Sequence, residues 1–481
     1  MRVAFVHYHV KTGGVTRVIE NAFSALSAAY TDFDGVVLSG HPIPDDCILP
    51  TRVVDGLGYS DEYSGIDPLV LVERMESHAK AFLGDLPDIW HIHNFSLGKN
   101  PSMIDAVVEL AKRGYRLVLQ IHDFAEDGRP FNYRLRQNNV SAPGVYPLSE
   151  NIHYVVLNGR DYRILKRAGV PESRLTWLPN AIQIPKFEYD DDEDDTLNAF
   201  DELIVYPVRA VRRKNMGELL LHAVLSNKRR SYITTLGTTS RDFVDQYQQW
   251  KDFANELGLH VHFEISRKLG ISFDTLVDHA HYIISTSVAE GFGLGFIEPW
   301  IFGKTLIGRD LPEITEDFKA MGIQFNRLYD TLEIPISVFR FDEFRSRLAS
   351  LIEDYHLKYG IEWNPDWLQH WVDQCVRDQM IDFARLDEIA QREAIEAVQS
   401  SFDLQTSLRN KLDYRKEETA IIDSNSSIIE TELGIARYGT RLKTIYDGLL
   451  RSSADGKIEF ADERRVLSSF FSVERFLPLR T

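Results

Sequence analysis

Cysteine is scarce in this chain: of its 481 residues only two, Cys47 and Cys375, are cysteines. Two cysteines so far apart form neither a disulfide framework nor a metal or redox motif, so a reducing compartment is the simplest expectation. Long apolar runs are missing too, because none approaches the ~20 residues of a transmembrane helix. Met1 and Arg2 lead directly into a short apolar run without the pattern of a signal peptide. We therefore expect a cytoplasmic protein without stable membrane association.

An excess of positive charge is also absent. The chain carries 54 Lys and Arg residues against 72 Asp and Glu residues, which gives a formal net charge of −18. This charge disfavours general binding of nucleic acid or anionic lipid, since both present phosphates to a protein surface. Any phosphate that the protein binds is therefore expected at a local cluster of cations. The composition, 44% hydrophobic and 26% charged, is typical of a globular chain long enough for two or three domains.

The order of apolar runs predicts an α/β fold class. Short apolar runs alternate with helix-length amphipathic segments up to about residue 310, which is typical of parallel sheets covered by helices. An acidic run at residues 190–195 interrupts the series and marks an expected domain boundary. The expected strands cover residues 3–6, 35–38, 89–92, 116–121 and 154–157 before this run, and 203–208, 232–236, 260–263 and 282–285 after it.

Four segments follow from this pattern. Residues 1–185 and 186–345 are predicted to form two Rossmann-like, doubly wound domains that face a cleft. Residues 346–415 are predicted to be bridging helices that return toward the first domain. Residues 416–481 are predicted to be an additional helical extension, whose aromatic residues indicate core packing rather than a disordered tail. Coverage of the cleft and formation of a homo-oligomer remain open alternatives for this extension.

The stretch from Glu290 to Glu298 places three glycines, at positions 291, 293 and 295, between two glutamates. It follows an expected strand and runs into an expected short helix at 296–302. Its backbone N–H groups would therefore form an anion site at a helix N-terminus. The two carboxylates have a different use, because a carboxylate accepts hydrogen bonds from the hydroxyls of a sugar or ribose. The alternative interpretation is a solvated surface turn.

A second cluster follows the expected strand at 203–208. Arg209 and Lys214 stand five residues apart, directly before a helix. An arginine fork together with a lysine suits a diphosphate, whose charge must be stabilised as a bond to it breaks. Arg212 and Arg213, which lie between them, fit a basic surface turn better.

Polar residues also follow strands of the first half. Gly13 and Gly14 come after the first strand, at the edge where open α/β sheets bind ligands, and Thr16 is expected to cap the next helix. His122 and Asp123 end a later strand. His122 is a candidate general acid or hydrogen-bond donor to a substrate hydroxyl.

Two further histidines, His91 and His93, lie two residues apart in one expected strand and so share one face of it. Zinc would need a third ligand, and none is evident nearby. No metal site is expected, and His91 is predicted to be a hydrogen-bonded core residue.

Taken in order, these motifs resemble glycosyltransferase family 4, the retaining nucleotide-sugar enzymes of the GT-B fold. The resemblance covers residues 3–315, and the chain departs from it at Ala181, where the family often has glycine, and in its longer C-terminal region. The matching residues are Gly13, Gly14, His93, His122, the Leu-Pro-Asn-Ala-Ile run at 178–182, Arg209, Lys214, Glu290 and Glu298.

The resemblance implies roles for the residues of the second domain. Arg209 and Lys214 would bind the donor diphosphate, and Glu298 would bind the ribose hydroxyls. Glu290 would hold hydroxyls of the transferred hexose. The turn whose backbone amides would meet the sugar and phosphate consists of Phe292, Gly293, Leu294, Gly295 and Phe296.

In the first domain, the resemblance implies that His122 contacts the hexose and that Gly13 and Gly14 lie near the diphosphate. The usual proposal for the family is front-face substitution, in which the departing phosphate helps to deprotonate the acceptor and the anomeric configuration is retained. No protein nucleophile, metal or other cofactor is then required. The donor would be a GDP- or UDP-hexose carrying mannose or glucose, and the sequence does not choose among these.

The acceptor is expected to bind at the first domain. Asp123, Arg129, Tyr133 and Arg134 belong to a segment rich in arginine and aromatic residues, which suits a small soluble acceptor with a carboxylate or phosphate. A lipid acceptor is less expected, because no basic amphipathic helix is evident. Several alternatives stay open: a catalytically silent GT-B binding or partner subunit, a lipid- or polysaccharide-directed transferase, and an epimerase or phosphorylase of the same fold.

Overall fold

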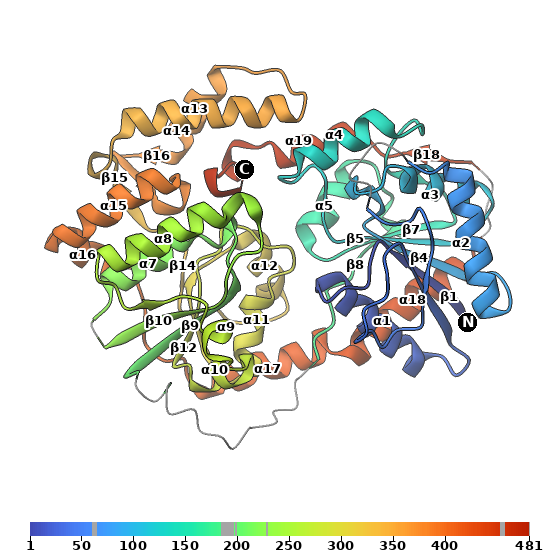
Figure 1. Ribbon diagram of the computed structural model, residues 1–481, viewed down its shortest axis with the longest axis horizontal. Coiled ribbons are helices and arrows are strands. Elements are labelled where there is room, and N and C mark those ends of the chain that lie inside the picture. The colour runs from blue at the N-terminus through green and yellow to red at the C-terminus, as the bar shows by residue number, and fades with distance from the viewer. Residues whose placement is uncertain (60–64, 184–196, 198–199, 228, 453–456, 481) are drawn as a thin grey trace. The chain divides into compact units, whose positions relative to one another are not determined.

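The computed structural model describes residues 1–59, 65–183, 197, 200–227, 229–452 and 457–480 (Figure 1). The chain forms two compact units. The first comprises Met1–Gln183, Lys358–Gly360 and Thr431–Ser472, and the second comprises Ile184–Leu357, Ile361–Glu430 and Val473–Thr481. The acidic run at 190–195, expected at the domain boundary, lies outside the described residues.

The first unit is built on a parallel seven-stranded sheet with the order β3-β2-β1-β4-β5-β7-β8. The chain moves outward from β1 to β3 and then crosses back to β4, so the strand order reverses between β1 and β4. Ligands of open α/β sheets bind at the carboxyl ends of the strands beside such a reversal. The strands are β1 (Arg2–His7), β2 (Asp34–Ser39), β3 (Thr51–Val53), β4 (Ile89–His93), β5 (Leu117–Ile121), β7 (Ile152–Val156) and β8 (Leu175–Trp177).

Local sequence signals set the helix ends in this unit. For example, Asp67 caps α2 by accepting a hydrogen bond from the Leu69 amide, Pro68 occupies the first turn, and Gly84 ends the helix in a left-handed conformation. The other elements are α1 (Gly14–Ala29), α2 (Pro68–Leu83), α3 (Ser102–Lys112), α4 (Pro130–Asn139), α5 (Gly159–Arg167), α18 (Ile435–Leu450), α19 (Glu463–Phe470), and the short strands β6 (Pro147–Leu148) and β18 (Glu459–Phe460).

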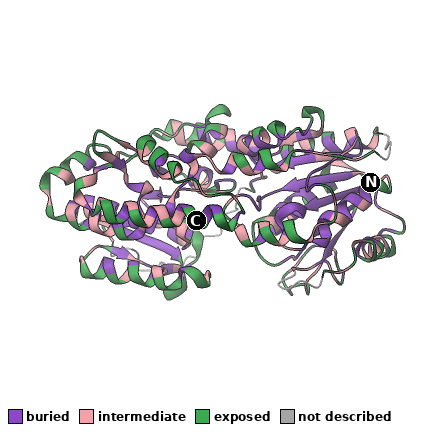
Figure 2. Cartoon of the chain, turned by 90° about the horizontal axis from the view of Figure 1, so that it is seen from above, coloured by how far each residue is buried: buried purple, intermediate pink, exposed green. Residues whose placement is uncertain are grey.

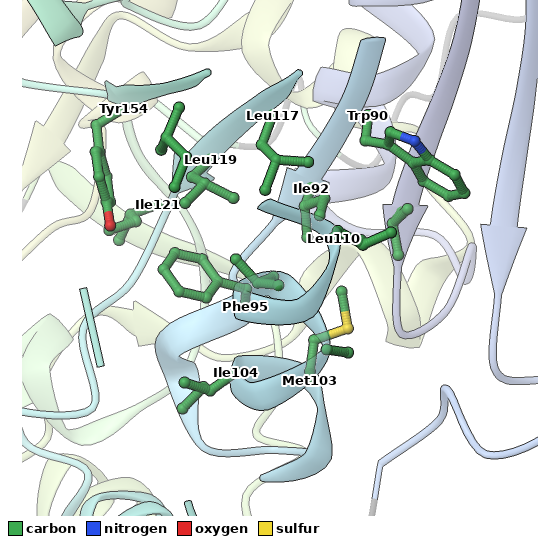
Figure 3. Close-up of a cluster of buried hydrophobic side chains, with 14 of the residues drawn as sticks. Trp90, Ile92, Phe95, Met103, Ile104, Leu110, Leu117, Leu119, Ile121 and Tyr154 are labelled. Carbon is green, nitrogen blue, oxygen red and sulfur yellow. The ribbon is translucent and has the colours of Figure 1, made fainter. Parts of the chain in front are cut away.

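The sheet of the first unit is buried on both faces, as its uninterrupted apolar strands predict. Successive apolar residues of β1, β2, β5 and β7 alternate between two core clusters, one on each face. Figure 3 shows one cluster, in which Trp90, Ile92 and Leu119 of the sheet face Phe95 and the side chains of α3. Figure 2 shows the strands buried and the helices exposed on their outer sides.

The C-terminal extension completes the core of the first unit. Helix α18 packs against α1 (Figure 1), and its Tyr438, Leu442 and Tyr446 belong to the same cluster as Phe5 of β1. A side chain at Gly439 would press on Ala25, so the small residue permits close helix contact. Val466 and Phe470 of α19 join the opposite cluster. These aromatic residues therefore pack within their own chain, and the suggested homo-oligomer stays a prediction.

The second unit contains a parallel six-stranded sheet with the order β11-β10-β9-β12-β13-β14. Its strand order reverses between β9 and β12. The strands are β9 (Glu202–Arg209), β10 (Arg230–Leu236), β11 (Val261–His262), β12 (Tyr282–Ser285), β13 (Thr305–Arg309) and β14 (Leu328–Tyr329); the helices are α7 (Met216–Leu225), α8 (Val244–Glu256), α9 (Ile265–Leu269), α10 (Phe273–His279), α11 (Leu294–Ile301) and α12 (Pro312–Ala320).

The remainder of the second unit differs from the predicted segments. Residues 361–430 belong to this unit, and the part of the chain that returns to the first unit is Thr431–Ser472 together with Lys358–Gly360. The stretch expected to be helical contains a β-hairpin, because Asp378 and Gln379 both adopt positive φ and form its tight turn. These elements are α13 (Phe341–Lys358), α14 (Asp366–Cys375), α15 (Glu388–Ser400), α16 (Phe402–Arg409), α17 (Thr419–Leu433), β15 (Glu333–Pro335), β16 (Val376–Arg377) and β17 (Met380–Asp382).

The mixed α/β architecture with two doubly wound parallel sheets confirms the predicted fold class. Among the described helices, none combines the length and the apolar character needed to cross a membrane.

Candidate functional site

The carboxyl ends of β9 and β12 carry the cation cluster and the first glutamate of the glycine-rich turn. The two strands are direct neighbours, paired through Ile204 and Val205, and they flank the point where strand order reverses. Strand β9 ends at Arg209, and a single helical turn at Arg212–Lys214 follows it. The loop after β12 leads through Glu290 into α11. The topology thus brings together residues about 80 positions apart in sequence.

Lys214 and Glu290 form an ion pair at this edge through the Lys214 Nζ and the Glu290 Oε1. Their side chains are only 16% and 15% exposed. Partial burial weakens solvent screening, so this pair is electrostatically stronger than one on the open surface. The pair leaves the Glu290 Oε2 available to another hydrogen-bond donor.

The backbone of Lys214 is held by residues that sequence reasoning missed. Its carbonyl oxygen accepts hydrogen bonds from the Tyr206 hydroxyl and the Thr286 hydroxyl, both at 3.0 Å. The Tyr206 hydroxyl also lies 2.8 Å from the Ser287 hydroxyl. Tyr206 lies in β9, and Thr286 and Ser287 directly follow β12. The run of hydroxyl residues after an apolar strand was the sequence signal that could have identified them. They fix the turn that carries the lysine.

Arg209 and Arg212 have different surroundings. The Arg209 side chain is exposed and makes one long hydrogen bond, 3.5 Å to the Thr239 hydroxyl; no carboxylate lies within ion-pair distance of it in the described part of the chain. Arg212 instead forms a bidentate ion pair with Glu388, with its Nε 2.6 Å from the carboxylate. The expectation that Arg212 is structural agrees with this contact, whereas Arg209 retains its donors for a ligand.

Glu298 lies on α11, about one turn after the start of this helix at Leu294. Burial raises the pKa of its carboxyl group, and the nearby positive charge of Lys214 partly opposes this shift. No hydrogen bond to its carboxylate is found within the described residues, although the residue is half-buried. A half-buried carboxylate without a protein partner is suited to accept hydrogen bonds from a bound ligand.

The glycines before and within α11 serve two purposes. Gly293 has a φ of 92°, and a Cβ there would lie 2.4 Å from the Ile314 side chain, so the fold itself requires glycine. At Gly295 an added Cβ would meet no atom within 4 Å. Packing therefore does not explain Gly295, and its expected place beside a ligand stays a prediction.

The aromatic residues of the turn are structural. The Phe292 ring packs edge-on against Phe318 at 5.7 Å, and Phe296 is fully buried. The Phe296 amide donates to the Gly293 carbonyl at 2.9 Å, which removes it from the expected set of free amides. The amides of Leu294 and Gly295, at the start of the helix, have no intrahelical acceptor.

In the first unit, the loop after β1 leads into α1 through Gly13 and Gly14. An added Cβ at Gly14 would meet nothing within 4 Å, as at Gly295. The expected cap by Thr16 is absent: α1 begins at Gly14, and the Thr16 hydroxyl donates to the Lys11 carbonyl at 2.6 Å. The hydroxyl closes the loop because Thr16 already lies inside the first turn.

His122 stands at the end of β5, on the same sheet edge. Its amide and that of Asp123 donate to the Asn94 side-chain oxygen at 2.7 and 3.1 Å. One ring nitrogen, Nε2, lies 2.8 Å from the His93 Nδ1. Burial lowers the pKa of His122 to about 4, and the Asp123 charge opposes this only in part. The ring is therefore neutral near pH 7, which disfavours a role as general acid.

Side chains of the predicted acceptor segment form contacts with other residues of the first unit. Arg129 pairs with Asp123 at 2.7 Å, and Arg134 donates to the Lys358 carbonyl at 2.7 Å. The Tyr133 ring packs against Tyr359, with centroids 5.1 Å apart. The loop is thus ordered by its own arginines, and their part in binding an acceptor stays a prediction.

His91 is a core residue, as expected. Its two ring nitrogens lie 2.8 Å from the Tyr446 hydroxyl and 2.9 Å from the Gln120 side-chain oxygen. No group of three or more His, Cys, Asp or Glu residues suited to a metal ion is found in the described part of the chain.

The chain was compared with known protein families and with known proteins. No model of a known protein family matches the sequence. The chain is 28% identical over 403 residues to mannosylglucosyl-3-phosphoglycerate synthase of Petrotoga mobilis, which covers 79% of this chain and 78% of that protein.

Solved structures share the fold at low sequence identity. A glycosyltransferase from Rickettsia africae superposes with a TM-score of 0.54 at 13% identity, covering 94% of this chain and 98% of that one. Anabaena HepE, solved in complex with UDP-glucose, superposes with a TM-score of 0.51 at 13% identity, covering 93% and 99%. These findings agree with the resemblance to glycosyltransferase family 4, and the fold of the chain is the GT-B fold.

Proposed function

We propose that this protein is a retaining glycosyltransferase that moves a hexose, mannose or glucose, from a GDP- or UDP-sugar to a small anionic acceptor. The observation that carries the proposal is the Lys214–Glu290 pair beside the exposed Arg209. The pair stands at the strand-order reversal of the second unit, where α/β sheets bind nucleotides. In the proposal, its cation would bind the diphosphate and its carboxylate would bind sugar hydroxyls.

The donor would bind along the edge of the second unit. Arg209 and Lys214 stabilise the negative charge that develops on the diphosphate as the bond to the sugar breaks. The amides of Leu294 and Gly295 add the positive end of a helix dipole. Glu290 remains paired to Lys214 through one oxygen and accepts from hexose hydroxyls through the other.

Glu298 completes donor binding by accepting hydrogen bonds from the two ribose hydroxyls. Its carboxylate is half-buried and makes no hydrogen bond within the described residues, so it would be free to accept from a vicinal diol. In the first unit, Gly13 and Gly14 would approach the diphosphate, and neutral His122 would donate a hydrogen bond to the hexose.

The reaction requires no protein nucleophile. The bond between the anomeric carbon and the diphosphate breaks while the acceptor oxygen attacks the same face, and the departing phosphate takes the acceptor proton. The new glycosidic bond therefore keeps the anomeric configuration of the donor. Catalysis then depends on positioning and on charge stabilisation of the leaving group.

An anionic acceptor is supported by the named product of the Petrotoga relative, mannosylglucosyl-3-phosphoglycerate, which carries a phosphate and a carboxylate. In this chain the acceptor would bind near Asp123, Arg129, Tyr133 and Arg134. Because Arg129 is already neutralised by Asp123, an incoming anion would have to share or displace that pair.

The test is a panel of nucleotide sugars, each combined with phosphorylated, carboxylated or neutral sugar or glycerate acceptors and with lipid and polysaccharide acceptors. Nucleotide release is the signal. Release that depends on an anionic acceptor supports the proposal, and release that depends on a lipid or polysaccharide acceptor redirects it. Donor binding without turnover in any combination identifies a silent binding protein. Silence together with no donor binding refutes the transferase assignment.

The acceptor site is tested separately with Arg134→Ala, because this substitution removes a cation without leaving the Asp123 carboxylate unpaired. A higher KM for the anionic acceptor, with unchanged acceptor-independent donor hydrolysis, supports its role. An unchanged KM places the acceptor elsewhere.

A further inference from the structure

Three imidazole rings stack across the ends of β4 and β5 in the first unit. The His91 and His93 rings lie 4.5 Å apart at an angle of 14°, and the His93 and His122 rings lie 5.1 Å apart at 22°. His93 is 1% exposed and His122 is 7% exposed, so the outer ring of the stack is His122. Strand register explains the arrangement, since β4 pairs with β5 in parallel and His93 lies opposite Gln120.

The contact between His93 and His122 constrains how protons are distributed. The His93 Nδ1 and the His122 Nε2 are 2.8 Å apart. Burial lowers the pKa of His93 well below its usual range and that of His122 to about 4. Both rings are therefore neutral near pH 7, and each carries a single N–H. A hydrogen bond between two neutral imidazoles needs a proton on only one of the two facing nitrogens. Either the His93 Nδ1 is protonated and the His122 Nε2 is not, or the reverse holds.

The second nitrogen of His93 decides which tautomers are present. Its Nε2 is buried and has no hydrogen-bond partner among the described residues. If His93 carried its proton on Nε2, a buried N–H would face no protein acceptor, which is rarer and more costly in proteins than an unfilled lone pair. If the proton is on Nδ1, that N–H donates to His122 and only a lone pair is left unfilled.

This assignment determines the state of His122. Its Nε2 then accepts the bond from His93, so its own proton must sit on Nδ1. The Nδ1 makes no hydrogen bond within the described residues, and the ring keeps 7% of its surface exposed. Nδ1 is thus the nitrogen that can meet a ligand.

We propose that His93 is a positioning residue that fixes His122 as the Nδ1–H tautomer, so that His122 offers a neutral hydrogen-bond donor to a ligand oxygen. The identity of that ligand as a hexose rests on the proposed function. The opposite tautomer would leave a lone pair on Nδ1, which accepts hydrogen bonds and can act as a base. The structure therefore assigns His122 to binding rather than to proton transfer.

The tautomer can be measured without any substrate. Long-range 15N–1H correlation spectra of the full chain labelled with 15N-histidine distinguish a protonated Nδ1 from a protonated Nε2. The His122 signals are assigned by their loss in His122→Asn. We expect His93 and His122 both to be Nδ1–H at neutral pH. An Nε2–H signal for His122 overturns the inference, whatever the activity of the protein.

Variants of His93 test the relay from one ring to the next. In His93→Asn the side-chain amide can donate from nearly the same place as Nδ1, so His122 should remain Nδ1–H. In His93→Leu no donor is present, and His122 should shift toward Nε2–H. His91→Gln is the matched control, because His91 stacks on His93 but bonds to Tyr446 and Gln120 instead of His122. A change in the His122 tautomer in the control, or none in His93→Leu, overturns the relay.

Turnover adds a second readout once a donor is found. His93→Leu should lower kcat by roughly tenfold to a hundredfold, the loss expected when one hydrogen bond to the ligand is not made, while nucleoside diphosphate affinity stays unchanged. His93→Asn should recover most of that loss. Equal losses in both variants indicate a merely structural role. If no donor is turned over but the tautomers are as expected, the proposed function fails and the inference about His93 stands.

Discussion

Removal of the Lys214 ammonium separates the structural and the chemical roles of the ion pair most clearly. In Lys214→Ala the carbonyl of residue 214 can still accept from Tyr206 and Thr286, so the turn should keep its shape. The loss of unfolding free energy should be only about 1 kcal/mol, since Glu290 is partly buried and retains some access to water.

Turnover should fall much further than stability. Loss of a cation directed at the leaving diphosphate lowers kcat by roughly 10²–10³-fold, or about 3–4 kcal/mol of transition-state stabilisation. Arg213→Ala is the matched control, because Arg213 is an exposed cation in the same turn and has no ion pair among the described residues. Both variants change the net charge equally.

The assay compares kcat, the KM for donor and thermal unfolding for the wild type and both variants. We expect Arg213→Ala to keep wild-type turnover within about twofold and Lys214→Ala to lose at least a hundredfold, with both proteins folded. Equal losses in the two variants would mean that only general charge matters. Near-full turnover of Lys214→Ala would refute the role of the ion pair.

Three further predictions concern donor binding and acid sensitivity. Gly295→Ala should raise the unfolding free energy by up to about 1 kcal/mol, because alanine is the better helix former. The same substitution should weaken donor binding, and unchanged donor affinity measured by calorimetry would contradict the ligand role of this glycine. Glu298→Gln should lower the preference for a nucleoside diphosphate over its 2′,3′-dideoxy analogue by about tenfold, and an unchanged preference would place the ribose elsewhere. Burial lowers the pKa of His91 to about 3 and of His122 to about 4, from 6.5. The folded protein therefore binds fewer protons than the unfolded chain between these values, and the unfolding free energy should fall as pH drops from about 6.5 to 4; a flat profile in denaturant titrations would contradict this.

The strands and the polar residues at their carboxyl ends could be predicted because they depend on local sequence. Residues 203–208 and 282–285 are apolar runs, and each is followed by a distinct polar signal, Arg209 in one case and Glu290 in the other. Parallel sheet topology then brings the ends of neighbouring strands together. That rule brings the loops of Lys214 and Glu290 to one edge of the sheet, whereas their ion pair is seen only in the folded chain.

Long-range packing could not be predicted in the same way. The association of α18 with α1 joins residues more than 400 positions apart, and nothing local in either helix specifies the other. The hairpin at Val376–Asp382 depends on left-handed conformations of Asp378 and Gln379. The spacing of apolar residues in this stretch indicates a helix and does not reveal such a turn. The sequence allowed the Thr16 hydroxyl either to cap the helix or to form a hydrogen bond within the loop. Because α1 begins at Gly14, the hydroxyl bonds to the Lys11 carbonyl in the loop.

The imidazole stack shows a further limit. Alternation along a strand places His91 and His93 on one face, but it does not reveal which of them meets His122. That depends on the register between β4 and β5 and on the partners of His91 in α18. The chemistry of His122 thus depends on contacts that only the folded chain defines.

The central claim is most directly tested by the anomeric configuration of the product, read from the one-bond carbon–proton coupling at the anomeric centre when a 13C-labelled nucleotide hexose is the donor. The account predicts transfer to an anionic acceptor with the configuration of the donor retained, and loss of this product in Lys214→Ala. An inverted product, or the same product at an undiminished rate from the variant, would contradict it.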